Sequence, residues 1–213
     1  WLGRRRGGNR PTWAKFLHIA TNSAQQAFIT VNYGTGSSNE AAAWVKSANL
    51  THRCGFKYWE IGNENFGNWE RGYTIDQTLN KDGQPKTISG ELYGKHCKVF
   101  MEEMRKAAKE VGNDIKIGVA AMDSHVTYDL VQRDWNQGMM KEAGNLADFI
   151  IVHSYHTPYQ ENSTVATILN SAGKSKDILQ YINTGLKTHA NRDPLPVALT
   201  EWNIFATGSA QQV

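Results

Sequence analysis

Five short apolar runs recur along this 213-residue chain, and helix-like stretches separate them. The runs cover residues 27–32, 57–62, 115–121, 149–155 and 196–201, and each is rich in β-branched or aromatic residues. Such runs are typical of strands that are buried in a parallel sheet. Because parallel strands need crossover connections, the alternation of runs and helices predicts an α/β protein. Periodicity alone does not choose between an open, doubly wound sheet and part of a barrel.

Three of the helix-like stretches have recognisable boundaries. Residues 40–49 follow a Ser-x-x-Glu sequence that begins at Ser37 and is typical of a helix N-terminus. Residues 89–111 repeat their apolar side chains close to the period of an α-helix, which predicts an amphipathic helix packed on the sheet. Residues 164–189 form the crossover before the last run, and we expect Gly173 to divide them into two helices.

The composition is that of an ordinary globular protein, with 40% hydrophobic and 20% charged residues. The net charge is only +3 and, apart from arginines within residues 1–10, the positive charge is dispersed, so we expect no nucleic-acid partner. No apolar run approaches the about 20 residues that span a bilayer, so we expect no membrane association. We predict one core domain over residues 11–213, with residues 1–10 as a basic segment outside it. Cys54 and Cys97 lack the spacing of a metal or redox site, and two ordinary thiols are expected.

Chemically active side chains follow the carboxyl ends of the five runs, where α/β proteins bind their ligands. Two of them are carboxylates, Glu64 and Glu201, which are far apart in the sequence but are expected at the same rim. Hydrolysis of a glycosidic bond needs such a pair, because one carboxyl protonates the leaving oxygen while the other attacks the anomeric carbon or activates water. The polar segment 68–88, which directly follows the second run, is expected to shape this site.

The sequences around both glutamates resemble a known group of enzymes. Residues 58–64, YWEIGNE, are similar to the fourth-strand motif of the clan of retaining (β/α)8-barrel glycoside hydrolases, in which an Asn-Glu pair supplies the acid/base. Residues 199–203, LTEWN, resemble the seventh-strand nucleophile motif of that clan. Together with residues 29–36, ITVNYGTG, and 40–45, EAAAWV, the Asn-Glu segment looks most like the α-L-arabinofuranosidase family.

The resemblance implies a partial (β/α)8 TIM barrel that covers the third to the seventh strand. A complete barrel has eight strands and typically about 250 residues, so we expect the chain to be part of a longer protein. The resemblance also implies retention of configuration, which predicts carboxyl groups roughly 5–5.5 Å apart rather than the about 6.5–9.5 Å of an inverting pair.

The resemblance assigns roles to single positions. Glu64 becomes the general acid/base, and Glu201 becomes the nucleophile that forms a glycosyl-enzyme intermediate. Asn63 is expected to bond the sugar 2-hydroxyl, and Tyr155 is expected to hold Glu201 ionised through a hydrogen bond. The full set of substrate-binding candidates is Asn32, Asn63, His153, Tyr155 and Trp202.

Other polar residues have simpler interpretations. Glu60 shares a strand face with Glu64 but lies deeper, which favours a hydrogen-bonded carboxylate inside the barrel. Trp69 is interpreted equally well as a wall of the substrate cleft or as a loop anchor. The histidines His125, His153 and His156 lack a metal-binding pattern, so no metal is predicted, and no cofactor is predicted either.

The resemblance therefore implies an exo-acting α-L-arabinofuranosidase that releases terminal α-L-arabinofuranosyl residues from hemicellulose-type glycans by double displacement. Its expected partner is an oligosaccharide or polysaccharide substrate. An endo-glycanase or β-xylosidase of the same clan is the nearest alternative. A non-catalytic carbohydrate-binding protein or an inactive barrel fragment is the alternative of another class. The sequence leaves the oligomeric state open, and only the substrate class favours a secreted or periplasmic location.

Overall fold

The computed structural model describes residues 12–22, 26–74 and 87–205. The basic segment 1–10 and most of the insertion 68–88 lie outside these residues. Within them, five parallel strands form one sheet: β1 Phe28–Val31, β2 Tyr58–Ile61, β3 Lys116–Ala121, β4 Phe149–Tyr155 and β5 Val197–Asn203. The prediction of β4 is confirmed residue for residue, and the bounds of the other four strands shift by one or two residues.

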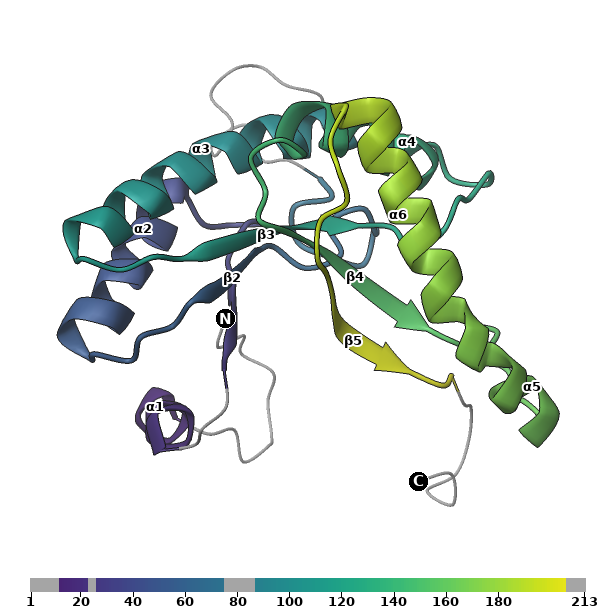
Figure 1. Cartoon of the computed structure of the whole chain (residues 1–213), viewed down its shortest axis with the longest axis horizontal. Helices are drawn as coiled ribbons and strands as arrows, with labels where there is room; N and C mark the ends of the chain where they lie inside the picture. The colour runs from purple at the N-terminus through teal and green to yellow at the C-terminus, as the bar shows by residue number, and fades with distance from the viewer. Residues whose placement is uncertain (1–11, 23–25, 75–86, 206–213) are drawn as a thin grey trace.

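The order of the strands decides between the two architectures that periodicity left open. The sheet runs β1-β2-β3-β4-β5, so each strand pairs with the next one along the chain. A doubly wound sheet reverses its order at a switch point, whereas a barrel continues in one direction. The sheet also curls, and α2, α3, α4 and α6 form an arc along its outer face (Figure 1). The chain is an α/β half-barrel, as the sequence predicted.

The helices agree in part with the sequence expectations. The stretch 40–49 is α2 Ser38–Lys46 followed by a π-helical turn, Ser47–Thr51, and the stretch 89–111 is α3 Gly90–Glu110. The last crossover consists of α5 Val165–Asn170, a 3-10 turn Ser171–Gly173 and α6 Lys174–Ala190, so the division at Gly173 is confirmed. Two further helices, α1 Trp13–Asn22 and α4 Leu130–Ala143, had no predicted range.

Side-chain caps fix where the helices begin. The Ser37 hydroxyl accepts a hydrogen bond from the Glu40 amide at 3.2 Å, as the Ser-x-x-Glu sequence indicated. At the start of α3, the Ser89 hydroxyl accepts from the amide of Leu92 at 3.1 Å. Each cap satisfies an amide that has no partner inside its helix. The loops that carry the site therefore end at defined points.

The core lies between the sheet and the arc of helices, and aromatic side chains join the two layers. Tyr93 on α3 is buried, and its hydroxyl donates to the Ile61 carbonyl at 2.6 Å and accepts from the Ala120 amide at 3.0 Å. Trp135 on α4 is also buried and donates its indole N–H to the Ala120 carbonyl at 2.8 Å. These bonds fix the carboxyl ends of β2 and β3, where the candidate site begins.

No helix among the described residues has both the length and the apolar character to cross a membrane. Cys54 is half-buried and Cys97 is buried, and both are free thiols.

Candidate active site

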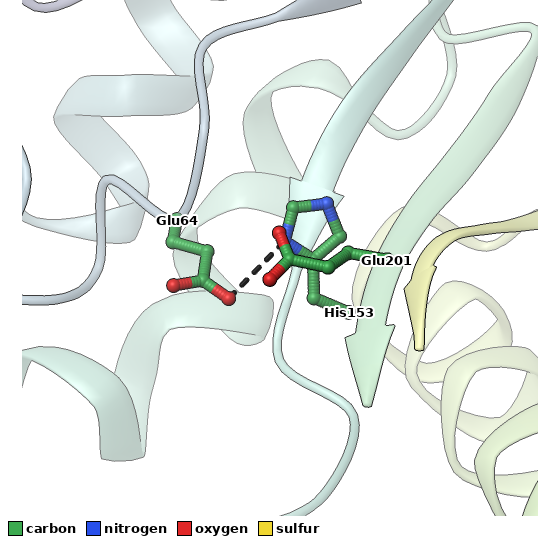
Figure 2. A group of neighbouring side chains, drawn as sticks. All are labelled: Glu64, His153 and Glu201. Atoms are coloured by element: carbon green, nitrogen blue, oxygen red, sulfur yellow. Dashed lines mark hydrogen bonds and ion pairs between the residues drawn. The ribbon is translucent and has the colours of Figure 1, made fainter. Parts of the chain in front are cut away.

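Three strand ends bring Glu64, His153 and Glu201 together (Figure 2). The Nδ1 atom of His153 lies 3.1 Å from Glu64 Oε1 and 3.3 Å from Glu201 Oε2. One carboxylate oxygen of Glu64 and one of Glu201 lie within 4.8 Å of each other. The two carboxylates that the sequence placed on one rim are therefore neighbours, with an imidazole between them.

A β-bulge directs Glu201 into this group. In the pairing of β4 with β5, Val152 lies opposite Leu199 and His153 lies opposite Glu201, so Thr200 is an extra residue in β5. A bulge of this kind re-aims the side chain that follows it. Glu201 therefore shares the sheet face of His153 and Tyr155.

Tyr155 holds the second carboxylate. Its hydroxyl donates a hydrogen bond of 2.6 Å to Glu201 Oε1. The bond to Glu201 raises the pKa of Tyr155 to about 12, so the hydroxyl stays protonated and remains a donor. The Lys174 ammonium donates to the Tyr155 carbonyl at 2.9 Å and lies 3.3 Å from Asp123 Oδ2. Asp123 also accepts from the Ser154 hydroxyl at 2.7 Å, which ties the ends of β3 and β4 to the start of α6.

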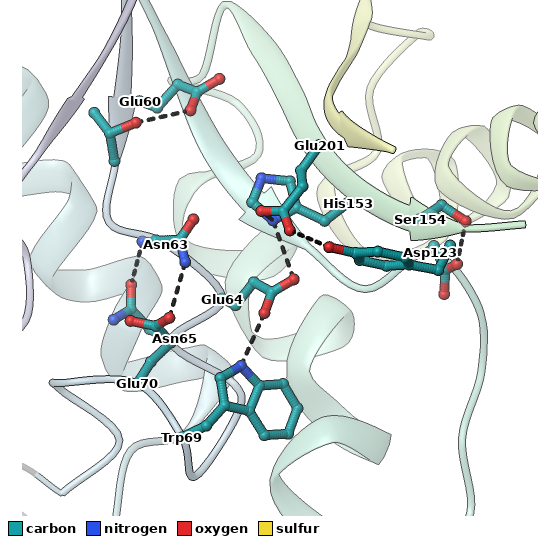
Figure 3. A network of polar contacts seen from close by, with 12 residues as sticks. Glu60, Asn63, Glu64, Asn65, Trp69, Glu70, Asp123, His153, Ser154 and Glu201 are labelled. Carbon is teal, nitrogen blue, oxygen red and sulfur yellow. Dashed lines mark hydrogen bonds and ion pairs between the residues drawn. The ribbon is translucent and has the colours of Figure 1, made fainter. Parts of the chain in front are cut away.

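Glu64 stands in a strained turn. Its φ of 42° lies in the left-handed region, which residues other than glycine rarely adopt and which costs free energy. The Gly67 amide closes the turn by donating to the Glu64 carbonyl at 2.7 Å. The Trp69 indole N–H donates to Glu64 Oε2 at 2.8 Å (Figure 3). Trp69 therefore contacts the carboxylate directly, which neither of its sequence interpretations specified.

The loop after β2 also positions Asn63. Its backbone amide donates to Asn65 Oδ1 at 3.1 Å, and the Asn65 side chain in turn donates to the Arg71 carbonyl at 2.8 Å. The side-chain amide of Asn63 donates to Glu70 Oε1 at 3.0 Å. Glu70 is thus a third carboxylate of the site that the sequence analysis missed, because a single glutamate in a polar loop forms no pattern.

The electrostatics of the group favour an ion pair between Glu64 and His153. The hydrogen bond from His153 lowers the pKa of Glu64, burial opposes this change, and the bond from Trp69 reinforces it. Burial would lower the pKa of His153, but the hydrogen bond to Glu64 and the charges of Glu64, Glu201 and Glu60 outweigh it, so that pKa is raised. In this arrangement the proton belongs to His153.

Glu60 lies deeper in the half-barrel and is buried. The Thr30 hydroxyl donates to Glu60 Oε2 at 3.1 Å. Burial raises the pKa of Glu60, and the hydrogen bonds with Thr200 and Thr30 oppose the rise. This environment matches the hydrogen-bonded interior carboxylate that the sequence favoured.

Among the described residues, Asn32 and Trp202 form no hydrogen bond with the carboxylates. Asn32 Oδ1 accepts from the Thr35 amide at 3.2 Å and Asn32 Nδ2 donates to the Thr35 hydroxyl at 2.9 Å, so its side chain closes the turn after β1. Trp202 pairs with Ser154, and because side chains alternate along a strand it faces away from Glu201. Its ring, 66% exposed, lies 6.5 Å from that of His156.

Glu64, His153 and Glu201 form the one group of side chains among the described residues whose donor atoms could surround a metal ion. His125 and His156 do not belong to it. Glu64 is hydrogen-bonded to His153, and Glu201 is hydrogen-bonded to Tyr155.

Comparison with solved structures shows the class of fold. No protein-family model and no curated protein matches the sequence. AbfB, a family 51 α-L-arabinofuranosidase from Bifidobacterium longum, is similar in structure, with a TM-score of 0.63 and 17% identity over 89% of this chain and 38% of its own. The GH51 arabinofuranosidase from Xanthomonas axonopodis pv. citri matches with a TM-score of 0.57 and 15% identity over 93% of this chain and 40% of its own. The chain thus has the fold of part of these barrels and spans about two-fifths of their length.

Proposed function

We propose that this chain carries the catalytic carboxylates of a retaining glycoside hydrolase, with Glu64 as the acid/base and Glu201 as the nucleophile. The observation that carries the proposal is the meeting of the two carboxylates at one rim, with oxygens within 4.8 Å of each other. So close an approach agrees with the roughly 5–5.5 Å between the carboxyl groups of a retaining pair. The hydrogen bond from Tyr155 to Glu201 adds support, because it keeps the nucleophile ionised and oriented.

The first half of the reaction forms a covalent intermediate. A Glu201 oxygen attacks the anomeric carbon while the bond from that carbon to the leaving oxygen breaks and Glu64 gives its proton to the leaving group. Glu64 first needs that proton, which His153 holds in the absence of substrate. A sugar bound between the carboxylates removes water and raises the pKa of Glu64, and the proton of His153 then passes to Glu64 along the hydrogen bond whose nitrogen and oxygen lie 3.1 Å apart.

The second half regenerates the enzyme. Glu64, now ionised, takes a proton from a water molecule whose oxygen attacks the anomeric carbon, and the bond between that carbon and Glu201 breaks. Two displacements at the same carbon retain its configuration. One residue thereby acts first as an acid and then as a base.

The substrate that we propose is a terminal α-L-arabinofuranosyl residue of a hemicellulose-type glycan. The motifs around Glu64 and Glu201 and the half-barrel likeness to two arabinofuranosidases support this choice. An endo-glycanase or a β-xylosidase would use the same two glutamates. Three substrates separate these activities. An arabinofuranosidase releases the aryl alcohol from an aryl α-L-arabinofuranoside, a β-xylosidase releases it from an aryl β-xyloside, and an endo-glycanase cleaves a polysaccharide internally.

The proposal is tested with Glu64→Gln and Glu201→Gln in the natural protein that contains this chain. Glu201→Gln should abolish turnover of every glycoside. Glu64→Gln should lower kcat by about 10²–10⁴-fold on substrates with poor leaving groups, and added azide should restore turnover of activated aryl glycosides by replacing water. Glu161→Gln, at an exposed position, is the matched control. Wild-type turnover by Glu201→Gln would refute the proposal, and saccharide binding without turnover by the wild type would favour the non-catalytic alternative.

A further inference from the structure

The turn that carries Glu64 ends at a third carboxylate. The Gly67 amide donates to the Glu64 carbonyl at 2.7 Å, and the Glu70 amide donates to the Gly67 carbonyl at 3.1 Å. These two bonds bring Glu70 back toward the rim. Figure 3 shows its side chain beside Asn63 and Asn65.

Glu70 contacts the residue next to the candidate acid/base. Its Oε1 accepts a hydrogen bond of 3.0 Å from the side-chain nitrogen of Asn63. An asparagine amide has a donating and an accepting end, and an ionised carboxylate can only accept. The bond to Glu70 therefore turns the nitrogen end of the Asn63 side-chain amide toward Glu70. The carbonyl end, Oδ1, accepts no hydrogen bond from any residue within the described ranges.

We propose that Glu70 is a positioning residue that fixes the Asn63 amide so that Oδ1 accepts a hydrogen bond from a sugar hydroxyl. This inference rests on the proposed function, in which Asn63 contacts the 2-hydroxyl. Interactions of that kind accelerate the reaction when they strengthen at the transition state. Glu70 itself touches no reacting atom and acts through Asn63.

A role for the charge of Glu70 alone is the competing explanation. Burial raises the pKa of Glu70, the bond from Asn63 opposes the rise, and the charges of Glu64 and Glu201 add to it. The three carboxylates therefore influence one another. A charge effect would not require Asn63, and this difference makes the two explanations separable.

Glu70→Ala and Glu70→Gln separate them in the natural protein. Glu70→Ala should lower kcat/KM by about 10- to 100-fold, the loss expected for a hydrogen bond to a charged group. Glu70→Gln keeps an accepting oxygen and should recover most of that loss. In an Asn63→Ala background, Glu70→Ala should cause no further loss. The loss should also vanish on the 2-deoxy form of the glycoside that the wild type hydrolyses, because that substrate lacks the hydroxyl.

Three results would overturn the proposal while the wild type is active. They are wild-type kinetics in Glu70→Ala, equal damage in Glu70→Gln and Glu70→Ala, and a full further loss in the Asn63→Ala background. Inactivity of the wild type on every glycoside would instead refute the proposed function. For that case, NMR of the Asn63 side-chain amide gives an independent result. Its proton shifts should change on Glu70→Gln and again on Glu70→Ala, and unchanged shifts would refute the contact.

Discussion

His153 is the residue on which both candidate catalytic carboxylates converge. Its Nδ1 lies 3.1 Å from a Glu64 oxygen and 3.3 Å from a Glu201 oxygen. A cation between two carboxylates reduces their repulsion and allows them to stand close together. The side chain of His153 is only 9% exposed, so water screens this interaction weakly. We infer that the spacing of the pair depends on the charge of His153.

This dependence predicts how the free energy of unfolding changes with pH. The raised pKa of His153 means that its contribution is fully present below its unfolded pKa, near 6.5, and is lost as pH rises through the folded pKa. The lowered pKa of Glu64 means that its contribution is present above its unfolded pKa, near 4.5, and is lost as pH falls through the folded pKa. Both contributions are therefore complete between pH 4.5 and 6.5.

We expect His153→Asn to lower the free energy of unfolding most within that window, by about 1–3 kcal/mol, and less at higher pH. Urea denaturation of wild type and variant at several pH values measures the difference. His125→Asn, at an exposed position, is the control. A difference that stays constant from pH 5 to pH 9 would show that the charge of His153 does not stabilise the group.

Among the secondary-structure elements, α3 has the most direct influence on the site. Its Tyr93 hydroxyl bridges the Ile61 carbonyl and the Ala120 amide, and Ile61 is the last residue of β2 before the turn that carries Glu64. The bridge therefore joins the helix to two adjacent strands. It also satisfies two backbone groups in the interior, where neither has water as a substitute.

Tyr93→Phe removes only the hydroxyl and leaves both backbone groups without this partner. We expect a loss of about 1–3 kcal/mol in the free energy of unfolding. We also expect a lower kcat, because the end of β2 is less firmly held. Tyr128→Phe, at a position that is 82% exposed, should change neither. Unchanged stability of Tyr93→Phe would show that another group replaces the hydroxyl.

Some of the secondary-structure elements could be predicted from the sequence, and others could not. The β4 run was recognisable because it begins with the continuous apolar sequence FIIV, and the break at Gly173 was recognisable because glycine disfavours helix. The range of α4 was not recognisable from the sequence, because its buried face includes the polar residue Asn136. The Asn136 side chain forms hydrogen bonds with both backbone groups of Met122. A buried polar residue interrupts the apolar period by which a helix is identified.

The candidate site divides in the same way. The proximity of Glu64 and Glu201 was predictable because the carboxyl ends of parallel strands share one edge. The left-handed turn at Glu64, the bulge at Thr200 and the bond from Asn63 to Glu70 were not. The turn and the bond lie within the loop after β2, and the bulge lies in the pairing of β4 with β5, so none of them follows from a local pattern in the sequence.

At the scale of the whole molecule, burial decreases from the centre of the sheet to its edge. Every residue of β3 from Ile117 onward is buried, and β3 pairs with strands on both sides. No residue of β5 is buried, and β5 pairs only with β4 among the described strands. Glu201, on this edge strand, has a side chain that is 43% exposed, compared with 19% for Glu64. The nucleophile candidate therefore stands on the less protected side of the half-barrel.

This gradient predicts the order in which backbone amides exchange with solvent hydrogen. Amides in well-packed central strands open only with the whole fold, whereas those with few apolar contacts open locally at a smaller free-energy cost. We expect the backbone amides of β3 to exchange slowest among the strands and those of β5, which carries Glu201, to exchange fastest. Hydrogen exchange of this chain, followed by mass spectrometry, measures the order. Equal protection of β5 and β3 would contradict the prediction and would mean that a further strand pairs with β5 in solution.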